Sequence, residues 1–151
     1  MKSNSGKKKI GEKIVKDYLE QKKIIITDKK KNGSDIVIKK SLRAKKEYTI
    51  EIKTTENLSG GIPDMHNTEF KETKTGLQLV ADYLYIVRLI DNNKCQIDIL
   101  TKKDVDKYAA GSKGHKTKTS VRVSSTLKTD LKKQKIGKSI ELKTTSHGNL
   151  A

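Results

Sequence analysis

The chain has 151 residues, of which 34% are charged and 32% hydrophobic, and its formal net charge is +16. This length suits one domain with a buried core, and the single cysteine, Cys95, excludes an intrachain disulfide and a zinc site built from several thiolates. We expect a flexible basic arm over residues 1–9, a single domain over 10–145 and a flexible tail over 146–151.

No apolar run approaches the ~18 residues that a membrane helix needs, and the basic start is not followed by the roughly 7–15 apolar residues of a secretory signal. We therefore expect a cytoplasmic protein that does not bind membranes. The strong positive charge attracts polyanions, of which nucleic acid is the commonest in the cytosol. Lysine supplies nearly all of this charge, so a coding bias toward lysine is the alternative explanation.

Apolar residues recur at helical spacing from Ile10 to Leu19, which predicts an amphipathic helix over 8–22. Short turns follow, one of them marked by Asn32-Gly33, the strongest short hairpin signal. Between the turns we expect strands at 23–27, 34–40 and 47–55. Such short connections predict an antiparallel three-stranded meander with the first helix packed on one face.

In the second half, glycines and Pro63 predict a loop over 56–70, and a helix is expected from Asn67 or Thr68 to Leu79 or Val80. Apolar runs predict strands at 82–90 and 95–100. A capping box at Thr101–Asp104 opens a helix that ends at Tyr108. Further strands are expected at 120–123 and 139–145. This order of helices and strands predicts an α/β fold.

Two charged residues interrupt the apolar strand 47–55. Glu51 and Lys53 are two residues apart and so point to one face, while Ile50 and Ile52 point to the other. If the strand 34–40 pairs with this one, Asp35 lies beside Glu51. Carboxylates are ligands that Mg²⁺ prefers, and an ammonium beside them could orient or deprotonate a water.

Each of these residues also has a simpler explanation. Glu51 and Lys53 could form an exposed ion pair worth about 0–1 kcal/mol. Asp35 could make an Asx turn after Asn32-Gly33. Glu12, at the rim of the first helix, could reach the same place as the strand residues, or it could only interact favourably with the helix dipole.

The segments "GSDIVI" (33–38) and "YTIEIKTT" (48–55), behind a helix that carries "GEKIVKDYL" (11–19), resemble the PD-(D/E)xK nuclease superfamily. The resemblance covers roughly residues 8–55, and the order of elements fits to about 108. It implies a restriction-endonuclease-like core, with a central mixed sheet and helices on both faces, that hydrolyses DNA phosphodiester bonds with Mg²⁺, for which Mn²⁺ can substitute. Ser34 stands where the named pattern has proline.

The same resemblance implies a role for each matching residue. Asp35 and Glu51 would ligate the metal together with the main-chain carbonyl of Ile52, and Lys53 would be the catalytic lysine. Glu12 matches a helix glutamate that several subfamilies use.

Two other segments match the motif less well. Asp64 with Glu69-Phe70-Lys71 has too short a separation for a strand, a turn and a second strand, so we treat it as a decoy. Asp130 with Glu141-Leu142-Lys143 is closer, because "IELKTT" nearly repeats "IEIKTT". Asp130 lacks strand character, and no helix and strand follow Glu141, so we favour the first copy.

Basic segments at 39–46 and 113–118, together with one loop histidine, are expected to contact DNA. These residues are Lys39, Lys40, Arg43, Lys45, Lys46, His66, Lys113, His115, Lys116 and Lys118. A solvated basic loop is the alternative for 113–118, and an exposed loop position for His66. Aromatic residues, at 4%, are too sparse for a single-strand stacking platform.

We expect a type II restriction endonuclease acting as a homodimer, because cutting both strands of a palindrome takes two sites related by a twofold axis. A Holliday-junction resolvase or repair nuclease of the same superfamily is the alternative enzyme. A non-catalytic basic module that binds nucleic acid is the alternative from another class. The sequence does not specify the recognition site. It also does not show whether a methyltransferase accompanies the protein.

Overall fold

The computed structural model describes residues 4–31, 34–56, 65–74, 76–109, 115–116, 120–122 and 137–144. The helices are α1 (Asn4–Gln21), α2 (Lys102–Ala109) and the short 3₁₀ helix η1 (Asn67–Glu69). The strands are β1 (Ile25–Ile26), β2 (Ile36–Lys39), β3 (Tyr48–Thr55), β4 (Met65–His66), β5 (Phe70–Thr73), β6 (Gly76–Leu79), β7 (Tyr83–Asp91), β8 (Lys94–Thr101), β9 (His115–Lys116), β10 (Ser120–Arg122) and β11 (Lys138–Lys143). No helix in these ranges is long and apolar enough to span a membrane.

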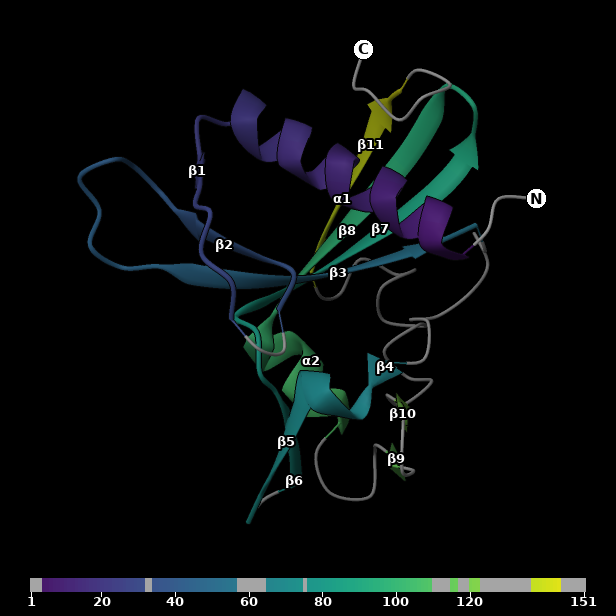
Figure 1. Cartoon of the computed structure of the whole chain (residues 1–151). Coiled ribbons are helices and arrows are strands. Elements are labelled where there is room, and N and C mark those ends of the chain that lie inside the picture. The colour runs from purple at the N-terminus through teal and green to yellow at the C-terminus, as the bar shows by residue number, and fades with distance from the viewer. Residues whose placement is uncertain are drawn as a thin grey trace.

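The main sheet has six strands in the order β1-β2-β3-β7-β8-β11 (Figure 1). β3 and β7 run parallel, whereas the other neighbours are antiparallel, so the sheet is mixed. The expected α/β class with a mixed sheet is confirmed, as is the antiparallel meander of the first three strands. β4-β10-β9 and β5-β6 form two small sheets that are not hydrogen-bonded to the main one.

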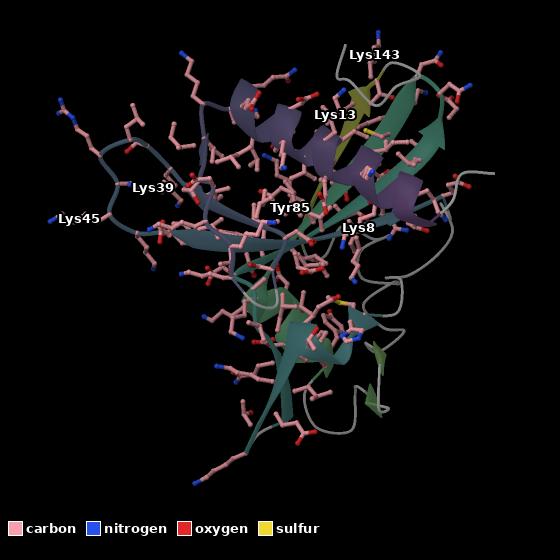
Figure 2. All side chains as sticks on the ribbon, viewed as in Figure 1. Lys8, Lys13, Lys39, Lys45, Tyr85 and Lys143 are labelled. Carbon is pink, nitrogen blue, oxygen red and sulfur yellow. The ribbon has the colours of Figure 1, made fainter. Side chains whose placement is uncertain are left out.

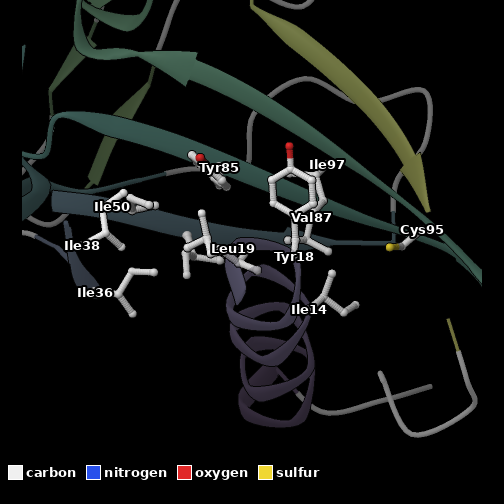
Figure 3. Packing of buried hydrophobic residues seen from close by; sticks show 12 residues of the cluster. Ile14, Tyr18, Leu19, Ile36, Ile38, Ile50, Tyr85, Val87, Cys95 and Ile97 are labelled. Carbon is white, nitrogen blue, oxygen red and sulfur yellow. The ribbon is translucent and has the colours of Figure 1, made fainter. Parts of the chain in front are cut away.

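Helix α1 packs on one face of the main sheet because its apolar residues fall on one side at helical spacing. Its residues Ile14, Val15, Tyr18 and Leu19 are buried there. They form a single cluster with residues from β2, β3, β7 and β8 (Figure 3), namely Ile36, Ile38, Ile50, Ile52, Tyr85, Val87, Cys95 and Ile97. β3 therefore turns its isoleucines toward α1.

The opposite face of the sheet is covered by a second group of elements, which we call the lower lobe: η1, β4–β6, β9, β10 and α2. Figure 1 shows these elements below the sheet. Leu84, Ile86 and Leu100 of the sheet share one buried cluster with the lobe residues Met65, Phe70, Leu77, Leu79, Ala81, Val105, Tyr108 and Ala109. A helix thus lies on each face of the sheet, with its own core cluster.

The expected boundaries of most elements agree with the structure. α1 begins earlier, at Asn4, and so includes much of the segment expected as a basic arm. The capping box of α2 is formed: Asp104 N–H donates to Thr101 Oγ1 at 3.2 Å, and Thr101 N–H donates to Asp104 Oδ2 at 3.0 Å. The tail at 146–151 lies outside the described residues.

The helix expected from Asn67 or Thr68 to Leu79 or Val80 is wrong. The chain forms η1 and then the antiparallel pair β5–β6. Gly76 has φ 124°, a conformation that favours glycine and closes this hairpin. Leu77 and Leu79 are buried two residues apart, as a strand requires, because one face of β6 packs against apolar residues of the main sheet and of α2.

Gly11 sets how closely α1 approaches β3. A Cβ atom at this position would lie 1.8 Å from Thr54 Oγ1. Alanine in a helix is favoured over glycine by about 1 kcal/mol, but overpacking costs about 1–3 kcal/mol. The added Cβ atom would clash with a side chain of β3, so we expect the cost of overpacking to exceed the gain from the helix preference.

We therefore expect Gly11→Ala to lower the free energy of unfolding by about 1–2 kcal/mol, against the usual helix preference. Urea unfolding followed by circular dichroism measures this. The control is Lys13→Ala, an exposed position of the same helix. If Gly11→Ala raises the stability instead, α1 does not pack this closely on β3.

Candidate active site

Asp35 stands immediately before β2 and is tied to β3 by two hydrogen bonds. Its N–H donates to the Ile50 carbonyl at 2.8 Å, and its Oδ2 accepts from the Ile52 N–H at 2.7 Å. The β2–β3 ladder ends with the pair Ile36–Ile50. The Asp35 carboxylate then accepts the next hydrogen bond along β3, where a backbone carbonyl of β2 would otherwise do so. This explains why an aspartate at the start of one strand lies beside the middle of the next.

The Ile52 carbonyl points to the same edge of β3 as Asp35. Within a strand, the N–H and C=O of one residue face the same neighbouring strand. Because the Ile52 N–H reaches Asp35, the Ile52 oxygen faces the region where β2 has ended. The expected backbone ligand is therefore directed toward the expected carboxylate ligand.

Glu51 and Lys53 project together from β3, on the face away from α1. In the parallel ladder their partners on β7 are Leu84 and Ile86, which belong to the lower-lobe cluster. Lys53 Nζ lies 3.8 Å from Glu51 Oε1, and Glu51 is only 5% exposed. An exposed ion pair, the simpler explanation, therefore does not describe these two residues.

Glu69, from η1, is the site residue that sequence reasoning misses. Its Oε1 accepts from Lys53 Nζ at 2.6 Å, closer than the oxygen of Glu51. Its other oxygen, Oε2, is buried and makes no hydrogen bond within the described part of the chain. An unsatisfied buried acceptor costs about 1–3 kcal/mol. Glu69 stands in the segment expected as a loop and helix, and only the folding of the lower lobe onto the sheet brings it to Lys53.

The charges around Glu51 do not balance. Burial is the largest cause that raises the pKa of the Glu51 carboxyl from its ordinary 4.5 to about 9; the charges of Glu69 and Asp35 contribute to the same rise, while the charge of Lys53 opposes it. A hydrogen bond with Asp35 also favours the protonated form of Glu51. A cation bound at these oxygens would relieve the same repulsion.

Helix α1 reaches the site through Lys8. Its Nζ lies 3.8 Å from Asp35 Oδ1, and Figure 2 shows Lys8 between α1 and the lower lobe. Glu12 is partly buried and lies four residues, about one helical turn, beyond Lys8 on the same side of the helix. A role for Glu12 in the site therefore stays a prediction. Glu12 lies one helical turn from Lys8, the α1 residue that contacts Asp35.

The donor set suits a hard divalent cation. Mg²⁺ is commonly held by one or two carboxylates and completes its octahedron with water and substrate oxygens. Asp35, Glu51 and the Ile52 carbonyl supply oxygens of this kind. In the ranges that the structure describes, no three His, Cys, Asp or Glu side chains group closely enough to hold a metal by themselves. Asp35 and Glu51 together would supply the two carboxylates of such a site.

A second buried charge cluster on the same face provides a contrast. Arg88 Nε donates to Asp98 Oδ2 at 2.7 Å, and Gln96 Nε2 and Ser139 Oγ each donate to Asp98 Oδ1 at 2.7 Å. Both oxygens of Asp98 are satisfied and its charge is matched. This cluster has the character of a structural cross-link, whereas the one around Glu51 has an excess of carboxylate oxygens.

Half of the residues expected to contact DNA lie on the hairpin of β2 and β3. Lys39 and Lys45 lie on the hairpin of β2 and β3, which projects from the sheet (Figure 2). Lys40 and Lys46 each hold their ammonium 5.1 Å from the centroid of the Tyr48 ring, and Arg43 is exposed in the turn. These cations therefore form one basic surface on the hairpin.

The remaining residues expected to contact DNA lie beyond the hairpin of β2 and β3. His66 Nδ1 accepts from the Thr68 N–H at 3.2 Å and lies 2.8 Å from Thr68 Oγ1, so the exposed ring is held within its own turn. His115 and Lys116 form β9. Lys113 and Lys118 lie outside the described residues.

The near-repeat of the motif lies far from this site. Glu141 and Lys143 are exposed on β11, at the edge of the sheet, with β8 and β7 between them and β3. Glu141 Oε1 lies 3.5 Å from Lys94 Nζ, in an ion pair between β11 and β8. Asp130 lies outside the described residues. The decoy at Asp64 also lies outside them, although its partner Glu69 does belong to the site.

No family model matches this chain, and neither the curated proteins nor the solved structures contain a significant match.

The raised pKa of Glu51 makes a prediction about stability without added metal. The folded state binds the Glu51 proton more tightly than the unfolded state, so the stabilisation is complete below pH 4.5 and is lost as the pH rises toward 9. Between pH 6 and 9, wild-type protein in EDTA should lose about 1–3 kcal/mol more unfolding free energy than Glu51→Gln.

Urea unfolding at several pH values measures this difference. Glu141→Gln, which removes an exposed carboxylate from the matching position of β11, should keep the slope of the wild-type protein. Equal slopes for wild type and Glu51→Gln would show that Glu51 is not buried among like charges.

Proposed function

We propose that this protein is a metal-dependent endonuclease that hydrolyses DNA phosphodiester bonds on a restriction-endonuclease-like core. One observation carries the proposal: Asp35, Glu51 and Lys53 lie together across two paired strands, with Glu51 buried among like charges. A mixed sheet with a helix on each face is the architecture that the resemblance implies. The fold alone would not support an activity, because one fold can host many functions.

The roles follow from the chemistry of each group. Asp35, Glu51 and the Ile52 carbonyl would hold Mg²⁺, which supplies charge stabilisation at the phosphate. Lys53 is only 20% exposed and stands beside Glu51, so its ammonium can orient a water toward the scissile phosphorus. Lys8 adds a second positive charge beside Asp35, suited to a phosphate oxygen.

The basic hairpin supports a nucleic-acid substrate. Its cations sit on a projecting element, and two of them are ordered over Tyr48. Contacts of this kind bind the DNA backbone and carry no sequence information. Action as a homodimer on a palindrome, as in a type II restriction enzyme, is the form we favour, and resolution of four-way junctions is the alternative.

The direct test is nicking of supercoiled plasmid with Mg²⁺ or Mn²⁺. We expect Lys53→Ala and Asp35→Asn each to lower the rate by about 10²-fold or more while DNA binding by gel shift persists. The matched controls are Glu141→Gln and Lys143→Ala, which change the near-repeat on β11 and should leave nicking unchanged.

The outcome also separates the alternatives. Discrete fragments from a long DNA would indicate a site-specific enzyme, and cleavage confined to four-way junctions would indicate a resolvase. Binding to plasmid and junctions without any cleavage would overturn the nuclease proposal and favour a basic binding module.

The basic hairpin gives a separate prediction about affinity. We expect Arg43→Ala combined with Lys45→Ala to reduce the slope of log K against log[salt] by about 1.8, because each phosphate contact on duplex DNA contributes about 0.9. Fluorescence anisotropy with a labelled duplex measures the slope. Lys103→Ala with Lys107→Ala, two exposed lysines of α2, is the control, and a slope change equal to that of the hairpin variant would contradict a hairpin-specific role.

A further inference from the structure

We propose that Glu69 positions Lys53, so that the reactive geometry of the site depends on the lower lobe as well as on β3. This inference deepens the proposed function and rests on it. It concerns a residue that the motif does not contain and that lies outside the main sheet.

The first observation is the order of the distances. Lys53 Nζ lies 2.6 Å from Glu69 Oε1 and 3.8 Å from Glu51 Oε1. The shorter contact is a charge-assisted hydrogen bond, and the longer one is only an electrostatic contact. A lysine amine sits at the end of a flexible four-carbon stem, so a strong partner decides where it rests. That partner is Glu69.

The second observation is burial. The Glu69 side chain is only 9% exposed, and its Oε2 is fully buried without a hydrogen bond in the described part of the chain. A carboxylate in such a place is unfavourable unless a cation holds it. Because apolar residues can often replace a buried ion pair without loss of stability, such a pair is weak evidence of a stabilising role. Glu69 is therefore better explained by where it holds Lys53 than by the stability it adds.

The third observation is the anchoring of Glu69. Its carbonyl accepts from the Val80 N–H at 2.9 Å, and the neighbouring Phe70 is buried in the lower-lobe cluster. On the other side of η1, Met65 is fully buried and pairs with Val121 of β10. Contacts on both sides of η1 thus fix the position of Glu69 relative to β3.

Glu69 acts on Lys53 and is not a third metal ligand. Its Oε1 is occupied by the ammonium, and its Oε2 is buried. The metal would stay with Asp35 and Glu51. Lys53 contacts Glu69 more closely than it contacts Glu51, so a change at Glu69 should alter the position of the amine more than the affinity for metal.

The first experiment needs no activity. The ammonium of Lys53 should give a resolved ¹⁵N–¹H signal in the full-length protein, identified by its loss in Lys53→Ala. We expect Glu69→Gln to broaden or shift this signal, and Glu72→Gln, an exposed position on the same strand as Phe70, to leave it unchanged. A Lys53 signal unaffected by Glu69→Gln would overturn the pairing, whether or not the protein cuts DNA.

The second experiment is a double-mutant cycle in single-turnover nicking. Glu69→Gln should lower the rate constant by about 10–100-fold, with the Mg²⁺ concentration at half-maximal rate and the DNA affinity each unchanged within about threefold. Glu69→Asp, which keeps the charge and shortens the side chain, should give an intermediate rate. Added to Lys53→Ala, Glu69→Gln should have no further effect, because its action passes through the amine.

Three outcomes would overturn the inference. These are a wild-type nicking rate for Glu69→Gln, an equal fold-loss when Glu69→Gln is added to wild type and to Lys53→Ala, and a strongly raised Mg²⁺ requirement, which would make Glu69 a ligand. If Glu69→Gln does not fold, judged by thermal unfolding, Glu69→Asp carries the same test. Failure of the wild-type protein to nick under any condition would instead remove the proposed function, and the Lys53 signal would still test the ion pair.

Discussion

The alternation of side chains along β3 is the constraint on which the rest of the structure depends. Ile50 and Ile52 point into the cluster beneath α1, and this commits Glu51 and Lys53 to the other face. A shift of register by one residue would bury both charges under α1 and expose the isoleucines. The hydrophobic face therefore holds the polar face in place, and α1 stabilises the site without lying on the same side as Glu51.

The polar face is then closed by the lower lobe, which makes the site a buried one. Glu51 is covered and Lys53 is mostly covered, whereas the second copy of the same sequence pattern, on the edge strand β11, stays exposed. Both copies have the same residue types at the same spacing. They differ in what packs on them, and burial turns a pair of ordinary charges into a cluster with strong mutual effects.

The comparison of the two buried clusters explains why only one of them suggests chemistry. At Asp98, an arginine, an amide and a hydroxyl satisfy both oxygens of one carboxylate. Around Glu51, the Lys53 ammonium is shared by Glu69 and Glu51, and the charge of Asp35, which Lys8 contacts, also raises the pKa of Glu51. A fold under selection for stability alone would have little use for such a surplus, since unmatched buried charge is destabilising. Perturbed ionisable groups of this kind are concentrated at functional sites.

Periodicity and turn residues in the sequence determined α1, the β1–β3 meander, β7, β8 and α2, because those elements depend on local spacing and on which face is apolar. They also determined that Asp35, Glu51 and Lys53 could meet, since one short turn joins their strands. Only the tertiary structure decided that 67–79 forms η1 and a hairpin, because apolar residues of the main sheet and of α2 provide the surface that buries Leu77 and Leu79. It alone decided that Glu69 pairs with Lys53, 16 residues away in sequence. The physical reason is that no local pattern encodes which distant segment will cover a polar face, whereas packing of the whole chain does.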